Sequence, residues 1–280
     1  MSRPEPPRII YDLGANNGED LRYYLLKADK VVAVEANPVL AAVIRARFAD
    51  EIAEGRVVVE NCALSDDSSV NQISFYVHRT QDGLSQLPRP AAEVIAEFDE
   101  ITVPAARIAE IVARHGAPHY VKIDLEGYDH VVLKDLFGAG IFPPYVSAEA
   151  HRIEVFCVLV AMGGYGAFKL VRSQFFEDRF ASTTVATAQG PRRFDFELMH
   201  MTGPYGDDLP GHWMDPVLFQ RYLGHVGPGW IDIHASRVDP PAGHRVRATA
   251  EIAASLLYQV GMRLNSSWMM RKSQQIWGAA

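Results

Sequence analysis

Short apolar runs alternate with segments of helical periodicity in the first part of the chain. The apolar runs cover residues 9–13, 31–34 and 57–59, and a polar or glycine-containing turn follows each of them. Apolar residues recur at helical spacing over residues 21–28 and 38–55. Buried strands that alternate with helices are typical of a parallel sheet, so the pattern predicts an α/β fold.

The alternation continues less regularly toward the middle of the chain. Further strands are predicted at residues 72–78, 120–124, 144–150, 168–171 and 230–233. Further helices are predicted at residues 91–98, 108–115, 129–137 and 155–162. The polar stretch at residues 79–90 is predicted to be a loop, and the whole pattern favours one mostly parallel sheet with helices on both faces.

Two segments near the C-terminus fit this alternation poorly. Residues 180–229 show weak periodicity and are predicted to be a long insertion before the last strand. We therefore expect a main domain at residues 1–236 and a linker with a helical extension at residues 237–280. The predicted helix at residues 250–264 carries an apolar stripe, which either packs on the domain or pairs two subunits as a homodimer.

Composition narrows the class of protein. The 280 residues are 48% apolar and 22% charged, which suits a globular fold. The formal net charge is −7 and no basic cluster is present, so a nucleic-acid partner is not expected. No run is long enough for an integral membrane segment or a signal peptide, so a cytoplasmic protein is expected. Cys62 and Cys157 lie in apolar runs and are predicted to be buried thiols.

The first strand runs into a glycine-spaced turn. Gly14 and Gly18 follow Asp12 with the spacing G-x-x-x-G, and Asn16 stands where a dinucleotide-binding loop has its second glycine. Acidic residues flank the turn on both sides. Carboxylates suit a cationic sulfonium and an amino group better than they suit a pyrophosphate.

Two further positions complete the predicted cofactor site. Glu35 ends the second strand, where a carboxylate can accept both ribose hydroxyls of an adenosine. Ala63 and Leu64 follow the third strand, where the adenine edge is expected. The turn, its acidic neighbours and Glu35 together favour an adenosyl cofactor, S-adenosyl-L-methionine.

Four segments also carry a family resemblance. They read DLGANNGED, VVAVEANP, VVVENCALSDD and YVKIDLEGYDHVVL. Over residues 9–171 the chain resembles the FkbM family of S-adenosylmethionine-dependent methyltransferases, whose hallmark is K-I-D-x-E-G. The resemblance implies a Rossmann-like class I methyltransferase fold with a seven-stranded sheet in the order 3-2-1-4-5-7-6.

The resemblance also implies an activity and site residues. The implied reaction is O-methyl transfer to a hydroxyl of a sugar, a glycolipid or a polyketide-type small molecule. Carried over to this sequence, Asp12, Gly14, Asn16 and Gly18 form the loop on the methionine side of the cofactor, and Glu35 binds the ribose.

Candidate catalytic residues lie where the fourth and fifth strands end. Lys122, Asp124 and Glu126 alternate along one strand, and Glu149 and His151 close the next. A hydroxyl acceptor needs a base, and His151 is expected to fill this role because histidine titrates near neutral pH. Two alternatives remain open, a structural Lys122–Glu126 ion pair and a Mg²⁺ site on Asp124 and Glu149, although no metal is predicted.

Weaker candidates and rival functions remain. The polar loop at residues 78–85 either closes over the cofactor or merely connects strands, and Tyr205, His212 and Trp213 either form an acceptor platform or pack locally. The rival functions are an NAD-dependent oxidoreductase on the same sheet and a non-catalytic adenosyl-binding protein. The oxidoreductase lacks support, because the turn has no third glycine and no catalytic Tyr/Lys or His/Asp arrangement is evident.

Overall fold

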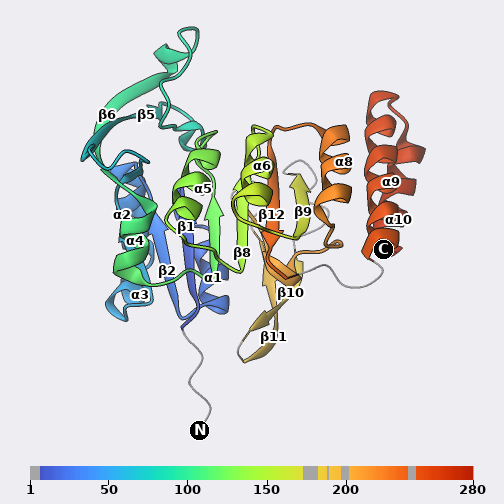
Figure 1. The fold of residues 1–280 in the computed structure, drawn as a ribbon, viewed down its shortest axis with the longest axis horizontal. Helices are drawn as coiled ribbons and strands as arrows, with labels where there is room; N and C mark the ends of the chain where they lie inside the picture. The colour runs from blue at the N-terminus through green and yellow to red at the C-terminus, as the bar shows by residue number, and fades with distance from the viewer. Residues whose placement is uncertain (1–6, 173–181, 188, 197–201, 239–243, 280) are drawn as a thin grey trace.

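A seven-stranded sheet crosses the middle of the molecule (Figure 1). The computed structural model describes residues 7–172, 182–187, 189–196, 202–238 and 244–279. The strands follow the order β3-β2-β1-β7-β8-β12-β9. They are β1 (Ile9–Leu13), β2 (Lys30–Val34), β3 (Val57–Glu60), β7 (Tyr120–Ile123), β8 (Tyr145–Glu149), β9 (Ala167–Arg172) and β12 (Ile231–Ser236).

This order confirms the predicted one. Numbered along the chain within this sheet, the strands lie as 3-2-1-4-5-7-6. Strands β3, β2, β1, β7 and β8 pair in parallel, whereas β12 runs antiparallel to both β8 and β9. The carboxyl ends of the five parallel strands therefore meet at one edge, where open α/β sheets bind their ligands.

Helices cover both faces of this sheet, as predicted. The helices beside it are α1 (Leu21–Lys27), α2 (Pro38–Arg47), α3 (Ala49–Ala53), α4 (Ile108–His115), α5 (Asp129–Gly138), α6 (Glu154–Ala161) and α8 (Pro216–Val226). Alternate residues of β1 enter two separate cores: Tyr11 belongs to the core that includes residues of α4, α5, α6 and α8, and Ile10 belongs to the core that includes residues of α1 and α2. Because both of its faces are covered, β1 is buried along its whole length.

A second, smaller sheet forms an arm above the carboxyl edge (Figure 1). Its strands are β4 (Ala63–Leu64), β5 (Gln72–His78) and β6 (Phe98–Ala106), in the order β4-β6-β5. The helix predicted at residues 91–98 is wrong, because only a short 3₁₀ turn, η2 (Ile95–Glu97), precedes β6. Alternating Ile101, Val103 and Ala105 were the available strand signal, and charged neighbours masked it.

The late segment is more regular than its sequence indicates. An antiparallel hairpin, β10 (Ser182–Thr187) with β11 (Gly190–Asp195), packs beside α1, and the 3₁₀ turn η4 (Gly206–Asp208) follows it. Helix α8 begins with Asp215, whose carboxylate accepts from the amides of Val217 and Leu218, and Pro216 stands at its first position. Helix α2 begins in the same way, with the side chain of Asn37 as its cap and Pro38 at its first position.

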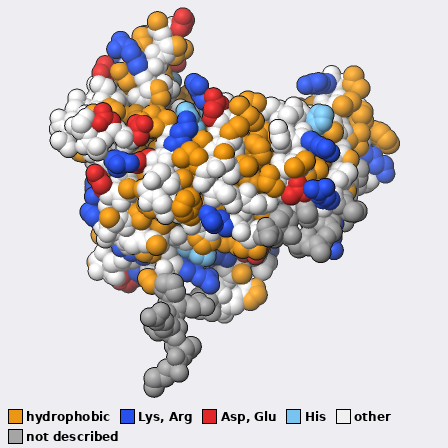
Figure 2. All heavy atoms as spheres, in the orientation of Figure 1, with side chains coloured by type: hydrophobic (Ala, Val, Ile, Leu, Met, Phe, Trp, Pro, Cys, Tyr) orange, Lys and Arg blue, Asp and Glu red, His pale blue; other side chains and the backbone are white. Residues whose placement is uncertain are grey.

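Two antiparallel helices end the chain and stand at the outer edge of the molecule (Figure 1). They are α9 (His244–Arg263), which extends the predicted helix, and α10 (Ser267–Ala279), which was not predicted. Apolar and basic side chains gather on this helical pair (Figure 2), and Leu264 and Trp268 are exposed. The linker expected at residues 239–243 lies outside the described residues, and the domain division at residue 236 stays a prediction.

The two cysteines, both predicted to be buried, differ in their exposure. Cys62 is buried as predicted, but Cys157 is exposed, because it lies on the outer side of α6 between the inward-facing Phe156 and Val158. An apolar neighbourhood in the sequence did not decide the orientation of this thiol. None of the described helices is both long and apolar enough to cross a membrane.

The turn after β1 packs directly against the end of β7. Gly14 has φ +83°, and a Cβ atom there would collide with the backbone oxygen of Asp124. On its other side, the Gly14 amide donates to Val34 O at 3.0 Å. The first glycine of the turn therefore lets β1, β2 and β7 approach one another at the carboxyl edge.

We expect Gly14→Ala to lower the free energy of unfolding by about 2–5 kcal/mol, from the left-handed backbone and the collision together. Gly55→Ala is the matched control, because Gly55 has φ +74° but no atom lies near its Cβ position. The control should cost only about 1–2 kcal/mol. Urea unfolding measures the free energy of unfolding of both variants. If the two substitutions lower it equally, the close approach of Gly14 to Asp124 contributes nothing to the cost.

Candidate active site

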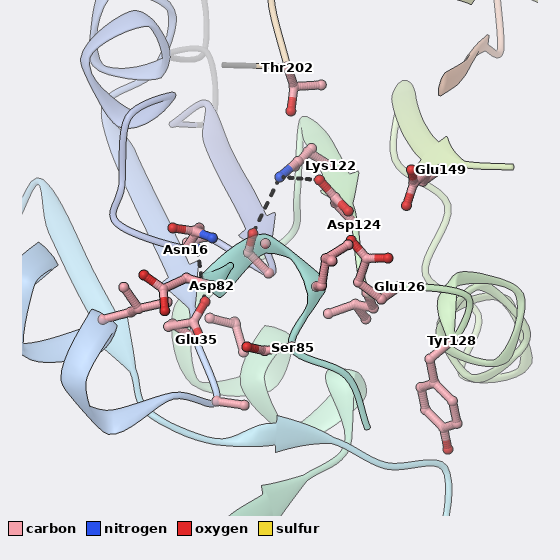
Figure 3. A pocket seen from close by; sticks show the side chains of 18 of the residues that line it. Asn16, Glu35, Asp82, Ser85, Lys122, Asp124, Glu126, Tyr128, Glu149 and Thr202 are labelled. Atoms are coloured by element: carbon pink, nitrogen blue, oxygen red, sulfur yellow. Dashed lines mark hydrogen bonds and ion pairs between the residues drawn. The ribbon is translucent and has the colours of Figure 1, made fainter. Parts of the chain in front are cut away.

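A cavity of about 680 Å³ opens at the carboxyl edge of the sheet. This volume lies within the range of about 300–1,000 Å³ that is usual for ligand sites. Its walls come from the turn after β1, the ends of β2, β7 and β8, and the loop of the arm. Figure 3 shows Asn16, Glu35 and Asp82 on one side of it, and Asp124, Glu126 and Glu149 on the other.

Glu35 organises the first side of the cavity. Its carboxylate accepts from the Asn16 amide at 2.8 Å and from the Asn37 amide at 2.7 Å, so it joins the glycine turn to the start of α2. Asn16 has φ +49°, a conformation that asparagine tolerates better than most residues. Burial raises the pKa of Glu35 to about 7, and the two amide hydrogen bonds only partly oppose this shift.

A buried lysine ties the ends of β1 and β7 together. The ammonium of Lys122 lies 3.5 Å from Asp12 and 3.4 Å from Asp124, and it donates to Gly14 O at 3.3 Å. Burial alone would lower the pKa of Lys122, but Asp12 and Asp124 raise it well above its ordinary value. The structural ion pair considered between Lys122 and Glu126 is not formed, because Lys122 turns toward Asp12 and Asp124 instead.

The second side of the cavity is strongly acidic. His151 Nε2 lies 2.9 Å from Glu149 and 3.5 Å from Glu126. These two carboxylates raise the pKa of His151 to about 10, while burial raises the pKa of Glu149 to about 7. An imidazole that these carboxylates keep protonated has no lone pair with which to accept a proton, so the arrangement does not favour the general-base role of His151, which stays a prediction.

The matches with known proteins agree with this geometry. The family model of the methyltransferase FkbM domain matches residues 12–156, more than half of the chain. The chain belongs to the FkbM methyltransferase family. The resemblance seen in the sequence is thereby confirmed, and a search of curated proteins found no match.

Solved structures resemble this chain only distantly. An FkbM methyltransferase from Methylobacillus flagellatus has 18% identity and a TM-score of 0.40, over 61% of this chain and 41% of that one. A precorrin-6Y C5,15-methyltransferase from Geobacter metallireducens has 11% identity and a TM-score of 0.36, over 84% and 83%. An O-methyltransferase from Thermotoga maritima has 10% identity and a TM-score of 0.36, over 82% and 59%.

This chain therefore spans less than half the length of the M. flagellatus protein. Similarity at these values does not bear on substrate or mechanism.

The structure brings most of the predicted site residues to one cavity. Its walls include the predicted residues Gly14, Asn16, Glu35, Ala63, Leu64, Lys122, Asp124 and Glu149. Asp12 and Gly18 lie behind the lining: Asp12 pairs with Lys122, and a Cβ at Gly18 would press on Ile44 and Phe48 of the α2 region. His151 also lies behind the lining, against Glu149.

Several lining residues were not predicted. Thr202 and Trp230 come from the late segment, and Asp232 comes from the last strand. Thr202 reaches the cavity because its amide donates to the buried carboxylate of Asp20 at 3.0 Å. The contact between Thr202 and Asp20 joins residues far apart in the sequence, so no local pattern predicts it. Trp230, by contrast, is a lone tryptophan at the start of a predicted strand, and this was a signal in the sequence.

The weaker candidates have different outcomes. Residues 81–85 of the polar loop line the cavity, with Asp82 on the same side as Asn16 and Glu35, which favours the covering role over a mere connection (Figure 3). Tyr205 is buried and stacks on Tyr120 with ring centroids 3.9 Å apart, and the Lys169 ammonium lies over the Trp213 ring. Neither aromatic residue lines the cavity, and neither does His212, so the expected acceptor platform is not formed.

The raised pKa of Glu35 makes stability depend on pH in a defined direction. The folded protein holds this proton more tightly than the unfolded chain, so the stabilisation is full below pH 4.5 and is lost as the pH rises through about 7. Glu35→Gln removes the titration. We expect the wild type without cofactor to lose about 2–3 kcal/mol relative to Glu35→Gln between pH 4.5 and 8.

Urea unfolding of both proteins across this pH range measures the difference. A constant offset between the two curves reflects the lost hydrogen bonds and is of no consequence. Parallel curves over the whole range would contradict a raised pKa at Glu35.

Proposed function

We propose that this chain is an S-adenosylmethionine-dependent O-methyltransferase that acts on a hydroxyl of a sugar, a glycolipid or a polyketide-type small molecule. The observation that carries the proposal is the continuous cavity between two chemically different walls. The wall at Glu35 suits an adenosyl group, and the wall at Asp124 and Glu149 suits a hydroxyl acceptor.

The first wall fits the cofactor by its donor set. Glu35 retains carboxylate lone pairs beyond its two amide bonds, and these can accept from ribose hydroxyls. Leu40, Ala63 and Leu64 add an apolar surface for the adenine ring, and the glycine turn leaves room beside Gly14. S-adenosylmethionine supplies an electrophilic methyl carbon when it is bound.

The second wall supplies the proton acceptor. The Asp124 side chain is 39% exposed, lines the cavity and lies beside the Lys122 ammonium. A hydroxyl that attacks a methyl carbon must lose its proton, and Asp124 accepts it here because Asp124 lines the cavity, whereas His151 lies behind the lining. Lys122 acts as a positioning residue, because its contacts with Asp12 and Gly14 O fix Asp124 relative to the cofactor wall.

The acceptor side of the cavity has the composition of a carbohydrate site. Trp230 is 67% exposed and lines the cavity together with Asp232. An aromatic face packs against the apolar face of a sugar ring, and carboxylates accept hydrogen bonds from its hydroxyls. Transfer of a labelled methyl group to a panel of sugars, glycolipids and small hydroxyl compounds tests this proposal directly.

We expect calorimetry to detect binding of S-adenosylmethionine and S-adenosylhomocysteine but not of NAD. Glu35→Ala should weaken adenosyl binding about ten- to a hundred-fold, through loss of a charged hydrogen-bond acceptor. Glu60→Ala is the matched control, since Glu60 ends the neighbouring strand β3 but pairs with Arg114 outside the cavity. Tight NAD binding without a response to either adenosyl ligand would refute the assignment.

Asp124→Asn should lower methyl transfer by about 10²–10⁴-fold while S-adenosylmethionine affinity stays within a few-fold of wild type. The reason is that Asp124 acts on the acceptor, and Lys122 keeps Asp12 as a partner in the variant. Asp99→Asn is the control, since Asp99 is an exposed carboxylate that pairs with Arg79 on the arm. If Asp124→Asn transfers the labelled methyl group at the wild-type rate, Asp124 is not the proton acceptor.

A further inference from the structure

Three ligand-type side chains converge at the acceptor end of the cavity. One carboxylate oxygen each of Glu126 and Glu149 and one ring nitrogen of His151 lie within 4.8 Å of one another. His151 Nε2 is 2.9 Å from Glu149 Oε2 and 3.5 Å from Glu126 Oε2. Among the described residues, this is the one group of three such side chains with donor atoms so close together.

The contacts within this group are not hydrogen bonds. Glu149 Oε2 and His151 Nε2 are both buried, yet neither has a hydrogen-bond partner in spite of their short separation. Polar atoms buried in this way normally find a partner. Three donor atoms within 4.8 Å of one another have the spacing of ligands around an ion.

The surroundings hold more acidic side chains than local cations can pair with, and burial together with neighbouring acids raises the pKa of Asp129 and of Asp232 well above the ordinary value. Asp124 and Asp232 line the same end of the cavity, and the fully buried Asp129 has a carboxylate oxygen without a hydrogen-bond partner. Lys122 is already paired with Asp12 and Asp124. A divalent cation would offset this surplus, which a lone imidazolium does not.

We propose that Glu126, Glu149 and His151 bind a divalent metal ion that holds the acceptor. The proposed site differs from the Asp124–Glu149 pair considered from the sequence, because it keeps only Glu149 of that pair and adds Glu126 and His151. Glu126 has φ +49° and Gly127 has φ +89°, and this turn brings the Glu126 carboxylate back toward β8. The proposal rests on the proposed function, since the site lies at the acceptor end.

Mn²⁺ fits this set of ligands best. Mg²⁺ prefers oxygen ligands alone, whereas imidazole suits transition metals, and two carboxylates favour the harder ions among them. An octahedral ion with three protein ligands keeps three positions open. Two of these can bind adjacent oxygen atoms of one substrate, so the class of acceptor is a vicinal diol or a hydroxy-carbonyl compound.

The ion and Asp124 would have separate roles in the reaction. A metal ion lowers the pKa of a hydroxyl that it binds, so the proton leaves more easily. Asp124 lies outside the three ligands and remains available to accept this proton. The oxygen then forms a bond to the methyl carbon as the carbon–sulfur bond breaks, and its proton goes to Asp124.

Mn²⁺ titration of the full chain, freed of metal with a chelator, tests the site without cofactor or acceptor. Calorimetry and the electron paramagnetic resonance signal of free Mn²⁺ should show a single ion bound per chain. Glu126→Gln, Glu149→Gln and His151→Asn should each raise the Mn²⁺ dissociation constant at least about 10–100-fold. Glu97→Gln is the matched control, because Glu97 pairs with His78 at 3.3 Å without a third ligand, and it should bind Mn²⁺ as wild type does.

Circular dichroism and S-adenosylmethionine affinity establish that each variant is folded. No binding at millimolar Mn²⁺, or equal binding by wild type and all three variants, would overturn the proposal. These outcomes are distinct from a failure of the proposed function. A protein that binds Mn²⁺ at this site but binds no S-adenosylmethionine would retain the metal site and lose the methyltransferase assignment.

Discussion

The cavity depends on the contacts that the Lys122 ammonium makes. This ammonium is buried at the carboxyl ends of β1 and β7, where it contacts Asp12, Asp124 and the backbone oxygen of Gly14. A charge without water must be paired, so these partners cannot separate from Lys122 without a large cost in free energy. This requirement holds the glycine turn against β7, at the distance that only glycine permits.

Two carboxylates with similar pKa shifts serve different ends of this cavity. Burial raises the pKa of Glu35 and of Glu149, each to about 7. Glu35 receives two backbone amides and therefore binds the glycine turn and α2 together. Glu149 lies beside His151 and near other acidic residues instead. This side of the cavity can therefore bind a cation or an acceptor rather than organise the backbone.

The sequence alone predicted the parts of this protein that depend on local pattern. Apolar runs and helical spacing correctly placed β1, β2, β7 and β8, and the motifs carried the family resemblance from which the strand order followed. Residues at the ends of these strands, such as Glu35 and Asp124, meet in the cavity because parallel strands share one carboxyl edge. Periodicity missed β6, since its alternation is interrupted by charged residues on an exposed arm.

Only the tertiary structure decided the properties that depend on distant residues. Thr202 reaches the cavity through a contact with Asp20 that no local pattern records. The sequence identified His151 as a histidine at the end of a strand, for which a neutral base is the ordinary interpretation. Glu126 and Glu149 raise the pKa of His151 far above neutrality, because electrostatic energy depends on separation in space and not along the chain.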